Sequence, residues 1–249
     1  MTPALAIRDL RKHFGGISVL TGASFDVMRG SITALIGSNG TGKSTLLNVV
    51  TGLLREDNGE IRLDGRNLRG VPAYARARLG LARTFQLTRA FGSFTVAEAV
   101  ELAATSPGDE RFGRSLMSVL GLGVRPVRPT RAILEQCLLD RIADSLCGAL
   151  SYGQTKLLML AQAIATNGSV LCLDELCAGL EPAVVAHVGQ VLRGLASDGK
   201  TILFIEHNLQ LVRDLATDAV FLHQGKTHRE GPTAAVLEDP DVVRLYLGQ

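Results

Sequence analysis

The chain has 249 residues, of which 46% are hydrophobic and 20% are charged. This composition is typical of a globular protein with a buried core and excludes a disordered or fibrous chain. The net charge of +2 is too even for a dedicated nucleic-acid binder. No apolar run approaches the roughly 20 residues that cross a bilayer, and the four cysteines show no C-x-x-C spacing. We therefore expect a soluble, cytosolic α/β protein with no nucleic-acid partner.

The first third of the chain predicts β structure followed by a strand–turn–helix unit. Residues 1–30 and 59–68 read as short β segments joined by glycine turns. Ser31–Ile36 is a short apolar run that ends at a glycine, as a buried strand does, and Lys43–Val50 has a helical pattern.

The middle of the chain predicts helices with few strands. Within residues 93–150, helical patterns cover Val96–Ala104 and Ile133–Leu146, and a connector rich in Gly, Pro and Arg lies at 121–129. A further helix is predicted over Thr155–Ala165. We interpret this region as a helical insert in an α/β core.

The last third returns to strands that alternate with helices. Val170–Leu173 and Thr201–Ile205 are apolar runs rich in strand formers, and Ala183–Leu195 between them predicts a helix. Such alternation favours parallel βαβ units and a mostly parallel sheet, in which chemistry collects at the carboxyl ends of the strands.

One phosphate-binding motif follows the first predicted parallel strand. Residues 37–44 fit G-x-x-x-x-G-K-[ST], in which backbone N–H groups and a helix N-terminus cradle phosphate oxygens. Lys43 is expected to reach the β- and γ-phosphates of a nucleotide, and the Ser44 hydroxyl to ligate Mg²⁺. The predicted ATP-binding set is Gly37, Ser38, Asn39, Gly40, Thr41, Gly42, Lys43, Ser44 and Thr45.

Two carboxylates follow the strand at Val170–Leu173. Asp174 is placed to hold Mg²⁺, and Glu175 to face the γ-phosphate and polarise an attacking water. The alternative for Glu175 is a solvated turn residue, which the neighbouring phosphate motif makes less favoured.

A second helix N-terminus carries a more specific signal. Leu150-Ser151-Tyr152-Gly153-Gln154 resembles the L-S-G-G-Q signature motif of the ATP-binding cassette (ABC) ATPases, with Tyr152 in place of the first Gly. Taken without the resemblance, this segment is only a capped helix and a possible anion site. With it, Ser151, Tyr152, Gly153 and Gln154 are expected to contact the ATP of a partner subunit.

The remaining motifs of the ABC family follow in order along the chain. Gln86 resembles the Q-loop glutamine that touches Mg²⁺ and water, residues 178–182 match the D-loop, and His207 matches the switch histidine at the γ-phosphate. Phe14 is placed like the aromatic residue that stacks on adenine. The resemblance therefore implies catalytic roles for Glu175, His207 and Gln86, and Mg²⁺ ligation by Ser44, Gln86 and Asp174.

Two positions depart from the family pattern. Leu176 stands where Pro usually follows the Asp-Glu pair, and Ser38 stands where the phosphate motif often has Pro. Neither supplies a reacting group, so we expect hydrolysis to be retained.

The resemblance covers nearly the whole chain and implies its organisation. We expect a single ABC ATPase domain over 1–249, with antiparallel β segments near its N-terminus, a mostly parallel core and a helical insert at about 88–155. One phosphate motif and one signature motif imply a head-to-tail dimer, with the same or a paralogous chain. The implied cofactors are ATP and Mg²⁺. The implied partners are transmembrane permease subunits and, indirectly, a solute-binding protein, at the cytoplasmic face of the cell membrane.

Four segments narrow the subfamily. Residues 83–86, 151–154, 178–182 and 239–248 together resemble the ATPases of branched-chain amino acid importers and their urea and amide relatives. A lipopolysaccharide-export cassette shares the terminal Tyr-Leu-Gly and is one alternative. A soluble regulatory ABC ATPase without a permease is the other.

Overall fold

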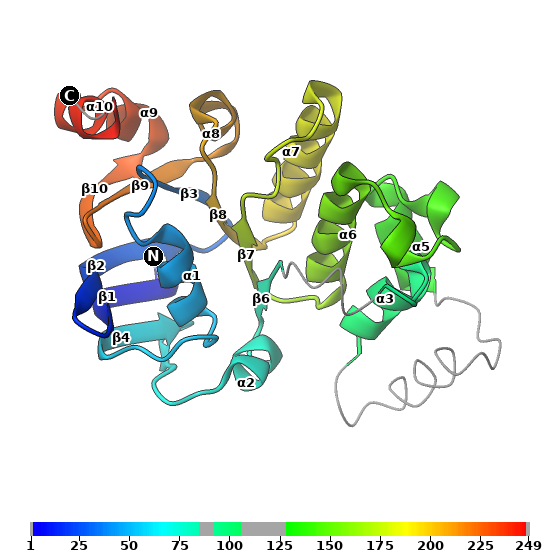
Figure 1. Cartoon of the computed structure of the whole chain (residues 1–249), viewed down its shortest axis with the longest axis horizontal. Helices are drawn as coiled ribbons and strands as arrows, with labels where there is room; N and C mark the ends of the chain where they lie inside the picture. Colours follow the sequence, from blue (N-terminus) through cyan, green and yellow to red (C-terminus); the bar gives the residue numbers. More distant parts are fainter. Residues whose placement is uncertain (1, 85–91, 106–127, 248–249) are drawn as a thin grey trace.

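The computed structural model describes residues 2–84, 92–105 and 128–247. In these ranges two β-sheets lie on one side of the molecule and a group of helices on the other (Figure 1). No helix in the described ranges is both long and apolar enough to cross a bilayer.

The first sheet is antiparallel and is built from the N-terminal quarter of the chain. Its strand order is β2-β1-β4-β5, with bounds Ile17–Met28, Pro3–Phe14, Asn58–Leu63 and Arg66–Asn67. β1 and β2 have 12 residues each, so the prediction of short segments was wrong for this pair. The sequence pattern does not show their full length, because the β1–β2 register shifts at several points. One of these shifts is near Asp9, whose φ is 45°.

The second sheet forms the centre of the fold and is mostly parallel, as predicted. Its order is β10-β9-β3-β8-β7-β6, and only β10 pairs antiparallel to its neighbour. The strands span Lys226–Pro232, Asp218–His223, Ile32–Ile36, Thr201–Ile205, Val170–Asp174 and Leu81–Arg83.

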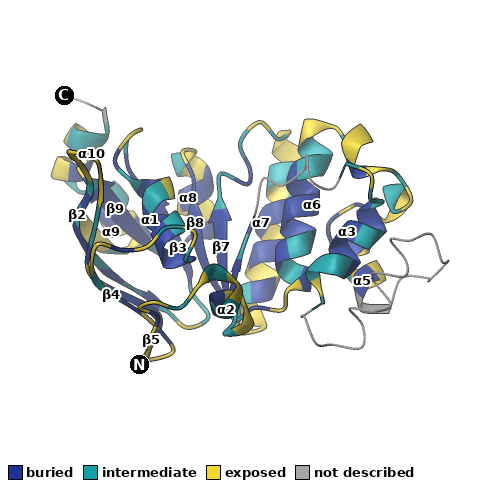
Figure 2. Ribbon diagram, turned by 60° about the horizontal axis from the view of Figure 1, so that its bottom comes forward, coloured by how far each residue is buried: buried dark blue, intermediate teal, exposed yellow. Residues whose placement is uncertain are grey.

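Strand periodicity divides the core into two apolar layers on the faces of this sheet. In β8, Leu203 and Ile205 join the cluster shared with the first sheet and α1 (Lys43–Val50), whereas Ile202 and Phe204 join the cluster under the other helices. Because both faces are covered, the strand is apolar at consecutive positions rather than alternating. The buried strands and helix faces are seen in Figure 2.

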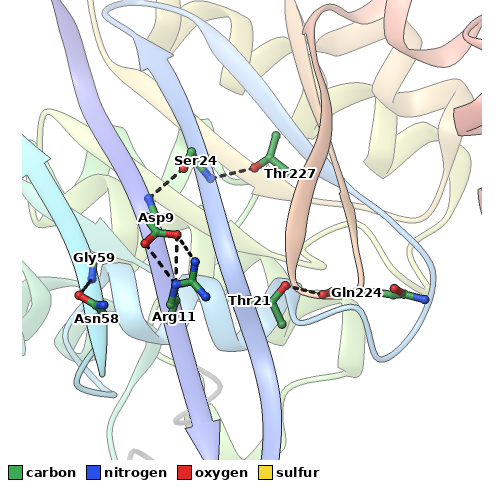
Figure 3. Close-up of polar contacts among 8 residues, drawn as sticks. All are labelled: Asp9, Arg11, Thr21, Ser24, Asn58, Gly59, Gln224 and Thr227. Atoms are coloured by element: carbon green, nitrogen blue, oxygen red, sulfur yellow. Dashed lines mark hydrogen bonds and ion pairs between the residues drawn. The ribbon is translucent and has the colours of Figure 1, made fainter.

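Polar contacts also join the two sheets along one edge. The Thr21 hydroxyl donates to the Gln224 carbonyl at 2.8 Å, and the Ser24 N–H donates to the Thr227 hydroxyl at 3.1 Å (Figure 3). The Ser24 hydroxyl in turn accepts the Asp9 N–H at 2.8 Å, in the irregular part of β1. These bonds fix β2 against the β9–β10 hairpin.

The helical side contains α3 (Val96–Ala103), α5 (Arg128–Gln136) and α6 (Tyr152–Ala165), with 3₁₀ turns at Asp140–Ile142 and Cys147–Ala149. The predicted helix over Ile133–Leu146 was wrong, because α5 ends at Gln136. Leu138 adopts a φ of 58°, and the Leu139 N–H donates to the Leu134 carbonyl at 2.8 Å, which closes the helix in a Schellman turn.

The limits of the helical insert, about 88–155, stay a prediction, because parts of the insert lie outside the described residues. Of the predicted connector at 121–129, the described residues 128 and 129 begin α5. The other helices in the described ranges are α2 (Ala73–Arg78), α7 (Pro182–Ser197), α8 (Leu209–Leu215), α9 (Thr233–Leu237) and α10 (Pro240–Leu247).

Candidate functional site

The glycine-rich motif forms the loop between β3 and α1, as predicted. Gly37, Gly40 and Gly42 have φ of 156°, 78° and 99°. A Cβ on Gly37 would lie 2.3 Å from the Leu222 carbonyl oxygen, and one on Gly42 would lie 2.9 Å from that of Val19. Positive φ therefore favours glycine at all three positions, and close packing requires it at Gly37 and Gly42.

Lys43 spans the inside of this loop. Its ammonium donates to the Gly37 and Ser38 carbonyls, both at 2.8 Å, and the residue is 6% exposed. Burial lowers the pKa of Lys43, while the nearby Glu175 and Asp174 carboxylates act in the opposite direction. The position of the ammonium at the loop is what a phosphate-binding lysine needs.

Asp174 ends β7 and is paired with a cation. Its Oδ2 lies 3.2 Å from the Arg83 guanidinium, which also donates to the Asn48 side chain on α1 and to the hydroxyl of Thr51, the residue after α1. Burial raises the pKa of Asp174, and Arg83 acts against this shift. Arg83 thus ties the end of β7 to α1.

Glu175 and His207 meet at the ends of neighbouring strands. The Glu175 Oε1 lies 3.0 Å from the His207 Nε2, although 32 residues separate them. Glu175 has a φ of 46°, and its N–H donates to the Ile205 carbonyl at 3.0 Å. The parallel pairing of β7 with β8 therefore brings together the two residues predicted to act at the γ-phosphate.

Two adjoining cavities are lined by nine of the predicted site residues. The first, of about 260 Å³, is lined by Val19, Asn39, Gly40, Gly42, Lys43, Ser44, Thr45, Glu175 and His207. The second, of about 390 Å³, is lined by Ser44, Leu53, Arg83, Thr84, Met159, Asp174 and Glu175. Ser44 and Glu175 border both, so the loop, the two carboxylates and the histidine face one space.

The signature residues lie elsewhere. Ser151 caps α6: its hydroxyl accepts the Gln154 N–H at 3.3 Å, and the Gln154 side chain accepts the Ser151 N–H at 2.8 Å. Tyr152 is 59% exposed. Residues 151–154 line neither of the two cavities, whereas Met159, farther along α6, lines the second.

Phe14 and Gln86 are the two remaining predicted site residues. Phe14 lies at the end of β1, is 44% exposed, and has the Lys12 ammonium 5.6 Å from its ring. Its stacking on adenine stays a prediction. Gln86 lies outside the described residues, and its role also stays a prediction.

Sequence reasoning missed three residues that support the site. Arg83 pairs with Asp174, and the Lys156 ammonium donates to the Glu175 carbonyl at 2.8 Å. The buried Glu206 accepts the Cys177 N–H at 2.9 Å, and burial raises the pKa of Glu206. A signal existed for Lys156, a lone cation in an otherwise apolar run of helix.

Replacing Lys43 with alanine tests the role of the loop. Loss of a charged hydrogen-bond donor is expected to weaken ATP affinity about ten- to a hundred-fold. Titration with ATP in the absence of Mg²⁺ measures the effect, and Lys226→Ala, at an exposed lysine on β10, is the control. Equal affinities of the Lys43→Ala variant and the unmodified chain would contradict the assignment of this loop.

Comparison with known proteins agrees with this geometry. Residues 20–178 match the ABC transporter family. The chain is 32% identical to the high-affinity branched-chain amino acid transport ATP-binding protein BraF of Pseudomonas aeruginosa, over 99% of the chain and 98% of the relative. It is 33% identical to the LivG protein of the same description from Salmonella typhimurium, with 99% and 98% covered.

Solved structures with a similar fold are also ATP-binding cassettes of ABC transporters. A nucleotide-free ATP-binding cassette from an ABC transporter superposes with a TM-score of 0.86 at 30% identity, with both chains fully covered. The ADP conformation of an ATP-binding cassette superposes with a TM-score of 0.84, also at 30% identity and full coverage. The chain therefore belongs to the ABC transporter ATP-binding family: it has the ABC ATPase fold, binds ATP and is an ATPase.

Proposed function

We propose that this ATPase powers an importer of branched-chain amino acids or of related small polar solutes such as urea and amides. The names of the relatives support amino acid transport. The observation that carries the transport role is an apolar groove between the core and the helical side, described below.

The first cavity suits the phosphate groups of a nucleoside triphosphate. It places the Lys43 ammonium and the first turn of α1 beside the glycine loop, so phosphate oxygens would meet both a cation and a helix N-terminus. The Ser44 hydroxyl and the Asp174 carboxylate border the second cavity, and such oxygen ligands suit Mg²⁺. When bound there, Mg²⁺ would neutralise charge on the phosphates.

Hydrolysis would use groups that are already positioned. Glu175 borders both cavities, and its carboxylate would accept a proton from the water that attacks the γ-phosphorus. His207 holds that carboxylate through its Nε2 and lines the same cavity, where it would contact the γ-phosphate. Gln86 is proposed as a further contact to Mg²⁺ and water.

A second cassette would complete the site. Because the signature residues do not line the cavities of their own chain, Ser151 and Gly153 would close over ATP held by a partner of the same or a paralogous sequence. The Ser151 and Gln154 N–H groups are bonded within the capping box, so the Tyr152 and Gly153 N–H groups of the exposed first turn of α6 would be the ones that contact a phosphate.

The apolar groove has a volume of about 330 Å³. It lies between α2, β6, α3 and α6. Seven of its twelve lining residues are alanine or leucine, and the other five are Thr51, Tyr74, Arg83, Gln162 and Thr166. Arg83 borders both this groove and the cavity at Asp174. A helix of a permease subunit seated here would therefore be separated from the proposed Mg²⁺ site by the side chain of Arg83. We place the chain at the cytoplasmic face of the membrane, held by permease subunits that also contact a solute-binding protein.

A substitution in the groove tests this docking. Ala77 is exposed and lines the groove, so Ala77→Arg would fill it with a bulky cation without disturbing the core. We expect the variant to keep ATP binding but to lose co-purification with membrane subunits. Ala235→Arg, at an exposed alanine on α9 far from the groove, is the control.

The outcomes separate the alternatives. Membrane subunits that co-purify with the unmodified chain and with Ala235→Arg, but not with Ala77→Arg, would support the transporter. Uptake of labelled leucine or urea by membranes that hold the complex would then identify an importer, and lipid export would identify the lipopolysaccharide type. No membrane partner with any variant would contradict the proposal and favour the soluble regulatory ATPase.

A further inference from the structure

α6 carries a buried cation that reaches the catalytic edge of the sheet. Lys156 is 3% exposed, and its ammonium donates to the Glu175 carbonyl at 2.8 Å. Within the described part of the chain no carboxylate forms an ion pair with it. Burying this ammonium has a desolvation cost that a methionine in the same space would not have.

The bond from Lys156 fixes the backbone at the residue proposed as the general base. Glu175 adopts a φ of 46°, which side chains with a Cβ rarely adopt. Its N–H is held by the Ile205 carbonyl and its C=O by Lys156. With both peptide groups anchored, the direction of the Glu175 side chain depends on the position of α6.

Tyr152 connects the same lysine to the signature motif. The Lys156 ammonium lies 5.5 Å from the centroid of the Tyr152 ring, a cation–π distance. The ring also packs on the loop after β7, because a Cβ on Gly179 would lie 3.0 Å from its Cε1. The aromatic residue that replaces the usual glycine is therefore packed against both α6 and the loop that follows Glu175.

We propose that Lys156, supported by Tyr152, is a positioning residue that couples the two ATP sites of a dimer. Ser151 and Glu175 of one chain serve different nucleotides, given the pairing of two cassettes under Proposed function. Lys156 lies between them on the first turns of α6 and contacts Glu175 directly. Engagement of Ser151 by the partner's ATP would hold α6 and thereby orient Glu175 toward the ATP of its own chain.

Lys156→Met is the first test, with ATPase rate measured against ATP concentration. We expect kcat to fall about ten- to a hundred-fold, as for loss of a charge-assisted hydrogen bond, and the Hill coefficient to fall toward 1. ATP affinity of the monomer without Mg²⁺ should be unchanged. Lys156→Arg, which keeps a cation for the carbonyl and the ring, should recover most of kcat and of the cooperativity.

The matched control is Lys200→Met. Lys200 also donates to a backbone carbonyl, that of Asn167 at 3.1 Å, but it lies before the start of β8, at the opposite end of that strand from His207. This variant should keep the kcat and Hill coefficient of the unmodified chain.

If Lys156→Met fails to fold, as shown by its thermal unfolding, the exposed Tyr152 supplies a second variant. Tyr152→Leu removes the ring that supports the ammonium and should lower both kcat and the Hill coefficient. If the unmodified dimer is cooperative and the folded variants keep the same Hill coefficient, the inference about Lys156 is wrong, while the pairing of two cassettes stands. An unmodified chain that hydrolyses ATP as a monomer would instead overturn the pairing on which it rests.

Discussion

The Glu175→Gln variant is expected to bind ATP normally and to lose about 10²- to 10⁴-fold in kcat, the range for removal of a general base. Glutamine keeps the shape and can still bond to the His207 ring, so the loop and Lys43 stay in place. It cannot take a proton from water at neutral pH. ATP should therefore bind, close the dimer and remain there.

Three measurements check this expectation. Equilibrium titration gives ATP affinity, phosphate release gives kcat, and size-exclusion chromatography with ATP shows the trapped dimer. Glu238→Gln is the matched control, because Glu238 is an exposed carboxylate whose only ion pair in the described residues is with Arg213 at 3.6 Å. Hydrolysis by Glu175→Gln at the unmodified rate would move the role of base elsewhere, with His207 the next candidate.

Local sequence patterns predicted those parts of the fold that local interactions decide. The strand before the glycine loop and the helix after it occur at Ile32–Ile36 and Lys43–Val50 as expected. Apolar runs buried on both faces predicted β7 and β8, and carboxylates directly after a strand predicted where Asp174 and Glu175 would stand. The motif alone was enough to predict this unit, because the conformation of the glycine-rich loop depends only on the strand before it and the helix after it.

Features that depend on tertiary packing could not be predicted in this way. Leucine has no preference for positive φ, so the sequence gives no signal that α5 ends before Leu138. The contacts from Arg83 to Asp174 and from Lys156 to Glu175 join positions 91 and 19 residues apart. Such pairs become visible only when the strands and helices are placed in space.

The Ser151→Arg variant is expected to bind ATP as a monomer, fail to form a closed dimer and show little hydrolysis. Ser151 is exposed at the N-cap of α6, so the substitution leaves the core intact. It removes the hydroxyl that accepts the Gln154 N–H and adds a bulky cation where the partner's phosphates would lie. ATP titration, chromatography with ATP and phosphate release measure the three expected effects. Glu135→Arg, at an exposed residue of α5, is the control for added charge.

Mixing Ser151→Arg with Lys43→Ala separates a shared site from a self-contained one. In a mixed dimer, the intact phosphate loop of the first chain faces the intact signature of the second, so one complete site forms. The opposite site combines both defects. Each variant alone should be nearly inactive, and the mixture should recover partial activity that rises with protein concentration. If each chain completed its own site, no mixture could recover activity, because every chain would carry a defect. Wild-type turnover by Ser151→Arg alone, independent of concentration, would likewise show that the signature does not act on a partner's ATP, and would remove the reason for a closing dimer to drive a permease.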